Sequence, residues 1–143
     1  LNPAPAQPLG QNILKLCDFV TPNEIEAEQI TGIPVKSVSD AEVAADKLLE
    51  KGASAAVITL GEQGALFKNG KQVIHQPSFQ VGPIVETTGA GDAFNGGLAV
   101  ALAEEMPIDK ALRFACATAS ISVTRPGTAP SMPDRNEIDT LIT

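Results

Sequence analysis

Hydrophobic residues along the chain follow two spacings, one typical of strands and one typical of helices. Short apolar runs end at glycine or proline, as buried strands do, whereas longer stretches repeat apolar residues every three or four positions, as amphipathic helices do. The predicted strands are 17–20, 55–60, 65–67, 72–74 and 79–85. The predicted helices are 24–30, 40–49, 93–104, 108–124 and a short one that starts at about Arg135. Strands that alternate with helices, then a hairpin, then further helices, indicate an α/β fold.

Local signals mark several boundaries of these elements. Thr21-Pro22-Asn23 is a turn and cap signal before the first helix, which Gly32 closes. Asp40 is the predicted cap of the second helix. The residues of that helix predicted to face inward are Ala41, Ala44, Ala45, Leu48 and Leu49. Asn69-Gly70 lies between two apolar runs, which predicts a two-residue hairpin turn.

The order of the elements predicts a layered core with a partly parallel sheet, in one unit over residues 1–143. In such sheets ligands bind at the carboxyl ends of the strands. Three loops follow predicted strands at such ends, namely 21–26, 59–64 and 86–92. Their shared position predicts a nucleotide site.

Composition excludes several classes of partner. Ten Lys and Arg against seventeen Asp and Glu give a formal net charge of −7 without any basic cluster, so nucleic acid and anionic membranes are not expected partners. Cys17, Cys116 and His75 have no neighbours at metal-ligand spacing, and we expect all three to be structural. Reduced thiols, and the lack of a membrane-spanning run or a leader in this sequence, favour a cytoplasmic protein.

One short segment carries most of the candidate chemistry. Gly89, Ala90 and Gly91 leave the backbone uncovered, and the apolar period after them opens a helix, so their N–H groups can converge on an anion such as a phosphate. Asp92 follows directly. A carboxylate beside an anion is unfavourable unless it has a function, and accepting a proton from an attacking hydroxyl is such a function.

The same residues also have a structural interpretation. Asp is a preferred N-cap, and Gly before Asp is common in turns. The common nucleotide motifs do not fit: Gly96 is followed by Gly97-Leu98 where a P-loop has Lys and Ser or Thr, and Phe94 replaces a glycine of the dinucleotide fingerprint. On these residues alone, both the base and the cap interpretations of Asp92 stay open.

Five segments, in order along the chain, resemble the ribokinase family of carbohydrate kinases. They are Asn2-Pro3-Ala4-Pro5-Ala6, Thr21-Pro22-Asn23-Glu24-Ile25-Glu26-Ala27-Glu28, Ile58-Thr59-Leu60-Gly61, Thr87-Thr88-Gly89-Ala90-Gly91-Asp92-Ala93-Phe94-Asn95-Gly96-Gly97 and Val123-Thr124-Arg125-Pro126-Gly127. The resemblance implies a layered α/β/α ribokinase-like core and an enzyme that phosphorylates the 5-hydroxyl of ribose. It also implies ATP and a small sugar as substrates, with Mg²⁺ and K⁺ as cofactors. It favours the catalytic interpretation of Asp92.

The resemblance further implies roles for individual residues. The residue matching Asp92 contacts the sugar and takes the proton from its hydroxyl, and those matching Gly89, Ala90 and Gly91 form the anion hole; Gly91 and Asp92 also contact ATP. Asn23 lies near the phosphates, and Glu26, one helical turn later, influences Mg²⁺ indirectly. The residues matching the ATP-binding loop are Thr59, Leu60, Gly61, Glu62, Gln63 and Gly64, and Cys116 matches a position near the adenine.

A monovalent cation, usually K⁺, is implied beside the anion hole, bound mainly by carbonyl oxygens. The matching positions are Glu86, Thr88, Ser122, Arg125, Gly127 and Ser131. Glu86 departs from the family pattern, in which an Asp is usual. The extra methylene displaces the carboxylate by about 1.5 Å, and this leaves the cation affinity or selectivity open.

The resemblance covers the ATP-binding and catalytic C-terminal half of the family's chain. The N-terminal half, with the sugar-binding residues and the lid through which whole kinases form homodimers, is not in this sequence, and Leu1-Asn2 is typical of a strand end. We therefore expect a fragment that does not phosphorylate ribose by itself. Two alternatives remain: a kinase of the same family for fructose, a sugar acid or a nucleoside, and a truncated nucleotide-binding module without catalysis.

Overall fold

The computed structural model describes residues 1–5, 7, 9 and 12–143. It comprises two compact units, unit 1 over Leu1–His75 and unit 2 over Gln76–Thr143. Ala6, the last residue of the first family-like segment, lies outside the described residues.

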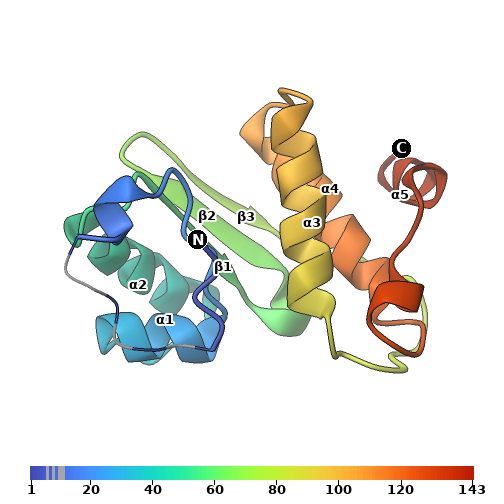
Figure 1. Ribbon diagram of the computed structural model, residues 1–143, viewed down its shortest axis with the longest axis horizontal. Helices are drawn as coiled ribbons and strands as arrows, with labels where there is room; N and C mark the ends of the chain where they lie inside the picture. The colour runs from blue at the N-terminus through green and yellow to red at the C-terminus, as the bar shows by residue number, and fades with distance from the viewer. Residues whose placement is uncertain (6, 8, 10–11) are drawn as a thin grey trace. The chain divides into compact units, whose positions relative to one another are not determined.

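Unit 1 carries a three-stranded sheet in the order β1–β2–β3 (Figure 1). The strands are β1 (Ala55–Thr59), β2 (Ala65–Asn69) and β3 (Val73–Gln76), and β1 pairs antiparallel with β2 so that Val57 faces Phe67. The predicted hairpin is confirmed, but its two turn residues are Gly70 and Lys71 and not Asn69 and Gly70, because Asn69 still belongs to β2 and pairs with Gln72. Asn69 holds its turn, because its N–H donates to the Gln72 carbonyl and its Oδ1 accepts the Lys71 and Gln72 N–H groups.

The predicted strand 17–20 is wrong as a regular strand, although its pairing survives in part. It follows a short 3-10 turn, η1 (Leu14–Leu16), and contributes one isolated parallel bridge, Val20 with Ala56; a second bridge, Asn23 with Thr59, follows it in the chain. The Val20 N–H donates to the Ala55 carbonyl at 3.0 Å. The next donor in this parallel pattern would be residue 22, which is Pro22 and has no N–H. The sheet is partly parallel through these bridges alone.

Two helices complete unit 1, α1 (Glu24–Thr31) and α2 (Val38–Glu50). Gly32 ends α1 in the left-handed conformation with φ 76°, as predicted. The predicted cap of α2 is wrong. Ser37 is the N-cap, because its side chain accepts the Asp40 N–H, while the Asp40 carboxylate accepts the Lys36 N–H at 3.1 Å. Ser and Asp are both good capping residues, and backbone conformation decided between them.

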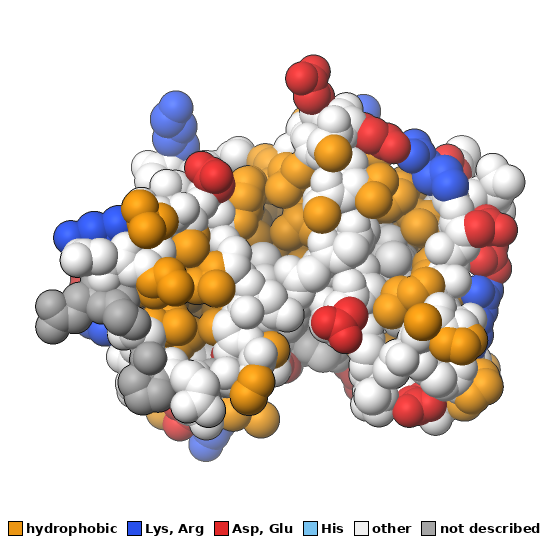
Figure 2. All heavy atoms as spheres, in the orientation of Figure 1, with side chains coloured by type: hydrophobic (Ala, Val, Ile, Leu, Met, Phe, Trp, Pro, Cys, Tyr) orange, Lys and Arg blue, Asp and Glu red, His pale blue; other side chains and the backbone are white. Residues whose placement is uncertain are grey.

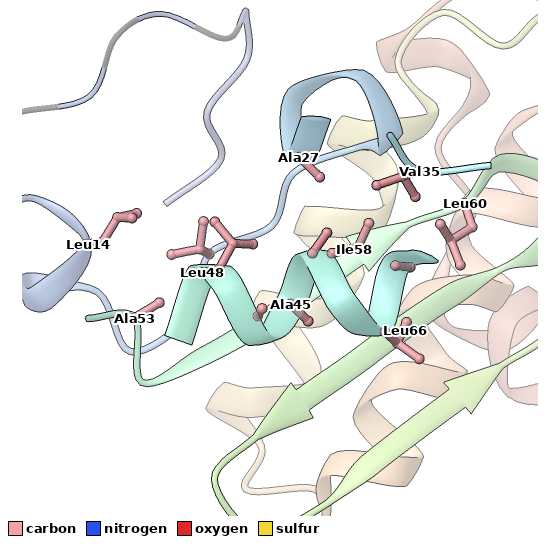
Figure 3. Packing of buried hydrophobic residues seen from close by; sticks show 13 residues of the cluster. Leu14, Ala27, Val35, Ala45, Leu48, Ala53, Ile58, Leu60 and Leu66 are labelled. Carbon is pink, nitrogen blue, oxygen red and sulfur yellow. The ribbon is translucent and has the colours of Figure 1, made fainter. Parts of the chain in front are cut away.

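The core of unit 1 joins α1 and α2 to the sheet. Figure 3 shows Ala27 of α1, Ala45 and Leu48 of α2 and Ile58 of β1 in one buried cluster. The buried residues of α2 are Ala41, Ala44, Ala45 and Leu48, while Leu49 is half-buried. Small side chains on this face let α2 lie close to the strands, so that the predicted inward face is confirmed apart from Leu49.

Unit 2 is helical, with α3 (Ala90–Ala103), α4 (Ile108–Ser122), the 3-10 turn η3 (Ala129–Ser131) and α5 (Arg135–Ile142). Figure 1 shows α3 packed along α4 and α5 beside α4. Phe94, Leu98 and Ala101 of α3 are buried, and Leu102 is half-buried. Figure 2 shows hydrophobic side chains over the outer surface of α3, where Val100 is 45% exposed.

The predicted strand 79–85 is wrong. These residues form no regular element, and they attach to α4 through single hydrogen bonds: the Phe79 N–H donates to Ser120 Oγ at 3.1 Å, and the Val85 N–H donates to the Val123 carbonyl at 2.8 Å. Gly82 and Pro83 interrupt the apolar run, and Pro83 has no N–H for a strand ladder. An apolar run here packs on a helix and not in the sheet.

No helix in the described ranges combines the length and the apolar character that crossing a membrane requires.

Gly97 permits the close approach of α3 to α4. A Cβ at Gly97 would lie 2.6 Å from Thr118 Oγ1 and 3.1 Å from Ala115 Cα, whereas nothing lies within 4 Å of a Cβ at the exposed Gly96. We expect Gly97→Ala to lower the free energy of unfolding of this chain by about 1–3 kcal/mol through overpacking. The matched control Gly96→Ala should raise it by about 0.5–1 kcal/mol through helix propensity. Urea unfolding of both variants checks this, and equal stabilities would contradict it.

Candidate functional site

The N-terminus of α3 is built on Gly89, which is its N-cap. Gly89 has φ 83°, a left-handed conformation that favours glycine, and its carbonyl accepts the Ala93 N–H at 2.9 Å. No side chain caps the helix. The N–H groups of Gly91 and Asp92 therefore have no acceptor inside α3, since a helix leaves its first N–H groups unpaired. These N–H groups and the positive end of the helix dipole together form a site suited to an anion.

Asp92 is the third residue of α3 and does not cap it. The interpretation of Asp92 as N-cap is wrong, because the glycine-rich residues continue the helix back to Ala90 and leave Gly89 at the cap position. Asp92 is exposed and lines a cavity of about 340 Å³ together with residues of α3, α4 and α5, among them Phe114, Thr118 and Arg135. Asp92 is thus an exposed carboxylate in the first turn of α3 without a capping role.

Glu86 joins the segment before α3 to the segment after α4. Its carboxylate accepts the Gly127 N–H at 2.8 Å, and its own N–H donates to the Val123 carbonyl at 3.2 Å. The hydrogen bond from Gly127, and after it the one from Thr88, hold the pKa of Glu86 below its ordinary value of 4.5. The Glu86 carboxylate is therefore ionised near neutral pH.

Oxygen atoms are the common feature of the residues predicted to bind a monovalent cation. All six belong to unit 2, and the Glu86–Gly127 hydrogen bond brings their two segments together: Glu86, Thr88, Ser122, Arg125, Gly127 and Ser131. A carboxylate, hydroxyls and carbonyls form a donor set that fits K⁺, which prefers carbonyl-type oxygen ligands. In the described part of the chain, no three His, Cys, Asp or Glu side chains converge on a metal position.

The loop after α4 also contacts the start of α3. A Cβ at Gly89 would lie 3.2 Å from Thr128 Cβ, so a larger residue here would require Thr128 to shift. Ser131 is buried and its Oγ donates to the Thr128 carbonyl at 2.6 Å. Thr128 was not found from the sequence, because its proximity to Gly89 depends on how the two loops pack.

Arg125 is tied to α5. Both of its terminal guanidinium nitrogens donate to the two carboxylate oxygens of Glu137, one of them over 3.2 Å. This pairing holds the pKa of the Glu137 carboxyl below its ordinary value. Sequence reasoning missed Glu137; the only available signal was its place three residues after Asp134, a spacing that indicates a helix start and nothing about a site.

The predicted site residues of unit 1 lie together at the end of β1. Asn23 pairs with Thr59, and the 3-10 turn η2 (Gly61–Gln63) follows β1. Asn23 and Glu26 form a capping box at α1, in which Asn23 Oδ1 accepts the Glu26 N–H at 2.8 Å and the buried Glu26 carboxylate accepts the Asn23 N–H at 2.9 Å. Leu60 is buried, whereas Gly61, Glu62 and Gln63 are exposed.

His75 and Cys116 have structural surroundings, as predicted for them. The His75 ring Nε2 lies 2.7 Å from the Gln63 carbonyl and so holds the η2 turn to β3. Cys116 is buried in α4, and this burial raises the pKa of its thiol to about 12. Its Sγ donates weakly to the Gln76 carbonyl at 3.8 Å. The Cys116 thiol is therefore neutral and unreactive, and its predicted place near an adenine stays a prediction.

Known proteins resemble this chain in both sequence and structure. A family model described as pfkB family carbohydrate kinase matches residues 1–135. The ribokinase of Haemophilus influenzae is 47% identical over 138 residues, which cover 96% of this chain and 44% of that protein. The deoxyribokinase of Salmonella typhi is 41% identical over 134 residues, which cover 93% of this chain and 44% of that protein.

The structural likeness is equally extensive. The structure of Arabidopsis thaliana ribokinase complexed with ribose and ATP matches with a TM-score of 0.91 and 34% identity, covering 95% of this chain and 44% of that chain. This likeness confirms the predicted ribokinase-like α/β fold. The chain spans less than half the length of each of these relatives.

Protonation of Glu86 is expected to weaken the contact between the two loops. Because the folded pKa lies below 4.5, the stabilisation from this carboxylate is present above that value and is lost as the pH falls through the folded pKa. We expect Glu86→Gln to lose less stability than the wild type between about pH 5 and about pH 3. Urea unfolding at both pH values measures the difference. Glu28→Gln, at an exposed glutamate of α1, is the control and should follow the wild type.

Proposed function

This chain belongs to the pfkB family of carbohydrate kinases, and we propose that the whole protein transfers the γ-phosphoryl group of ATP to the 5-hydroxyl of D-ribose. One observation carries the proposal: the uncapped N-terminus of α3 places unpaired N–H groups and the Asp92 carboxylate in the same helical turn. The N–H groups suit a phosphate, and the carboxylate suits a proton from an attacking alcohol.

The reaction needs a base and an anion site in close proximity. In the proposed step the Asp92 carboxylate accepts the proton of the sugar hydroxyl while that oxygen bonds to the γ-phosphorus and the bond from the γ-phosphorus to the β–γ bridging oxygen breaks. Of the predicted anion hole, the Gly89 and Gly91 N–H groups stabilise the negative charge on the transferring group, together with the Asp92 N–H. The Ala90 N–H already donates to the Thr87 carbonyl at 3.1 Å. ADP leaves with the bridging oxygen.

Unit 1 supplies the proposed nucleotide contacts. The loop 59–64 offers exposed backbone after β1, and Asn23 lies beside it through its pairing with Thr59. Bound Mg²⁺ would neutralise phosphate charge. Glu26 suits an indirect role toward Mg²⁺, since it is buried and its carboxylate is held by the Asn23 N–H. For K⁺, the proposed ligands are the oxygens around Glu86 and those of residues 122–131. The expected assembly of the whole protein is a homodimer formed through the lid.

Ribose is the favoured sugar because the ribokinases of Haemophilus influenzae and Bacillus subtilis, at 47% and 44% identity, are more similar to this chain than the deoxyribokinase. The 41% identity to a deoxyribokinase makes 2-deoxyribose the second candidate. The two sugars differ by one hydroxyl, and a site that hydrogen-bonds a hydroxyl discriminates strongly against the analogue that lacks it.

Asp92→Asn in the whole enzyme tests the base. We expect kcat to fall by about 10² to 10⁴, because the amide cannot accept the proton, with little change in the KM for ATP. A coupled assay of ADP release measures both constants. The matched control is Asp109→Asn, which removes a carboxylate from the first turn of α4 and should leave kcat unchanged. Wild-type kcat in Asp92→Asn would refute the catalytic role.

A sugar panel tests the substrate. We expect kcat/KM of the whole enzyme for D-ribose to exceed that for 2-deoxyribose and fructose by at least about tenfold. Product analysis by NMR should show the phosphate on the 5-oxygen. A preference for 2-deoxyribose would favour the second candidate, and a preference for fructose would assign the protein to another kinase of the family.

A further inference from the structure

Glu137 makes the contact that fixes the loop after α4 from outside that loop. Its carboxylate receives both terminal guanidinium nitrogens of Arg125, a two-point contact that sets direction as well as distance. The Arg125 and Glu137 side chains are only 35% and 39% exposed. The pair is therefore oriented, unlike a flexible ion pair on the surface.

Arg125 lies in the middle of the segment whose oxygens are proposed to bind K⁺. Its N–H donates to the Ser122 carbonyl at 3.2 Å, and two residues later the Gly127 N–H donates to the Glu86 carboxylate at 2.8 Å. The next residue, Thr128, lies against Gly89 at the start of α3. A displacement of Arg125 would therefore move the carbonyls of this segment and also Thr128, which lies against the start of α3.

The carboxylate of Glu137 is itself held in place by a hydrogen bond at the start of α5. It accepts the Asp134 N–H at 2.9 Å, while the Glu137 N–H donates to Asp134 Oδ1 at 3.0 Å, so Glu137 completes the capping box of α5. Arg135, the first residue of α5, in turn bonds Glu104 at 2.6 Å and lies over the Phe114 ring at 5.2 Å. The start of α5 is thus attached to α4 and to the end of α3.

We infer that Glu137 is a positioning residue for the monovalent cation site: by holding Arg125 it keeps the carbonyls of residues 122–127 directed at the cation. This inference rests on the proposed function, which places K⁺ among those oxygens. Loss of such a positioning contact lowers the affinity for the cation. A purely structural ion pair at this exposure would change stability slightly and leave cation affinity unaltered.

Glu137→Gln separates the two roles, because Gln still fits a capping box but carries no charge for Arg125. In the whole enzyme, the KCl concentration that gives half of the K⁺-dependent rise in Tm should increase about tenfold. Mutation of residues that orient metal ligands lowers metal affinity by about this factor. The titration is run without substrates, at constant ionic strength against tetramethylammonium chloride. The K⁺ concentration for half-maximal activity should increase in parallel, with the KM for ribose unchanged.

The control is Glu50→Gln, which removes the exposed ion pair with Lys47 on α2 and should leave the K⁺ midpoint unchanged. In an Arg125→Gln background, Glu137→Gln should add no further shift if the two residues act as one pair. Should Glu137→Gln fail to fold, Arg125→Lys tests the same contact, since Lys keeps the charge and loses the two-point geometry.

The outcomes are distinguishable. A wild-type K⁺ midpoint in Glu137→Gln, or an equal shift in Glu50→Gln, overturns the inference. A wild-type enzyme whose Tm does not respond to K⁺ overturns the proposed cation site and the inference together. A K⁺-dependent Tm that shifts as expected, in an enzyme that does not phosphorylate ribose, supports the inference and refutes only the proposed substrate.

Discussion

The hydrogen bond from the Gly127 N–H to the Glu86 carboxylate is the contact on which the candidate site of unit 2 depends. Glu86 precedes α3 and Gly127 follows α4, so this bond, 2.8 Å long, is one of those that join the two loops that contain the proposed cation ligands. A charged acceptor makes the bond stronger than one between neutral groups, and the lowered pKa of Glu86 keeps it charged. The Val123 carbonyl adds contacts to Val85 and Glu86 in the same place.

Two glycines give the helices of unit 2 the geometry that this contact requires. Gly89 has the left-handed conformation that starts α3 without a capping side chain, and it leaves room for Thr128. Gly97 lets α3 approach α4 at the level of Thr118. The helix therefore presents unpaired N–H groups at one end and a close packing surface along its side. The first feature suits phosphate binding and the second fixes where that end points.

Unit 1 shows how one pair of residues can serve structure and a proposed site together. Asn23 and Glu26 satisfy each other's N–H groups at the start of α1, which explains their spacing without any ligand. The same box fixes Asn23 beside Thr59, at the end of β1 where the proposed nucleotide loop begins. A spacing that indicates a helix cap is thus compatible with a binding role, and sequence alone could not separate the two.

The sequence by itself determined the features that depend on neighbouring residues in the chain. These are the apolar period of α2, the hairpin at Asn69-Gly70 and the family motifs around Asp92. Periodicity, turn chemistry and motif order are all local properties. Only the tertiary structure decided that residues 79–85 attach to α4 instead of forming a strand, and that Glu137 holds Arg125. Hydrogen bonds between residues far apart in sequence carry no local pattern. They exist only once the helices have packed.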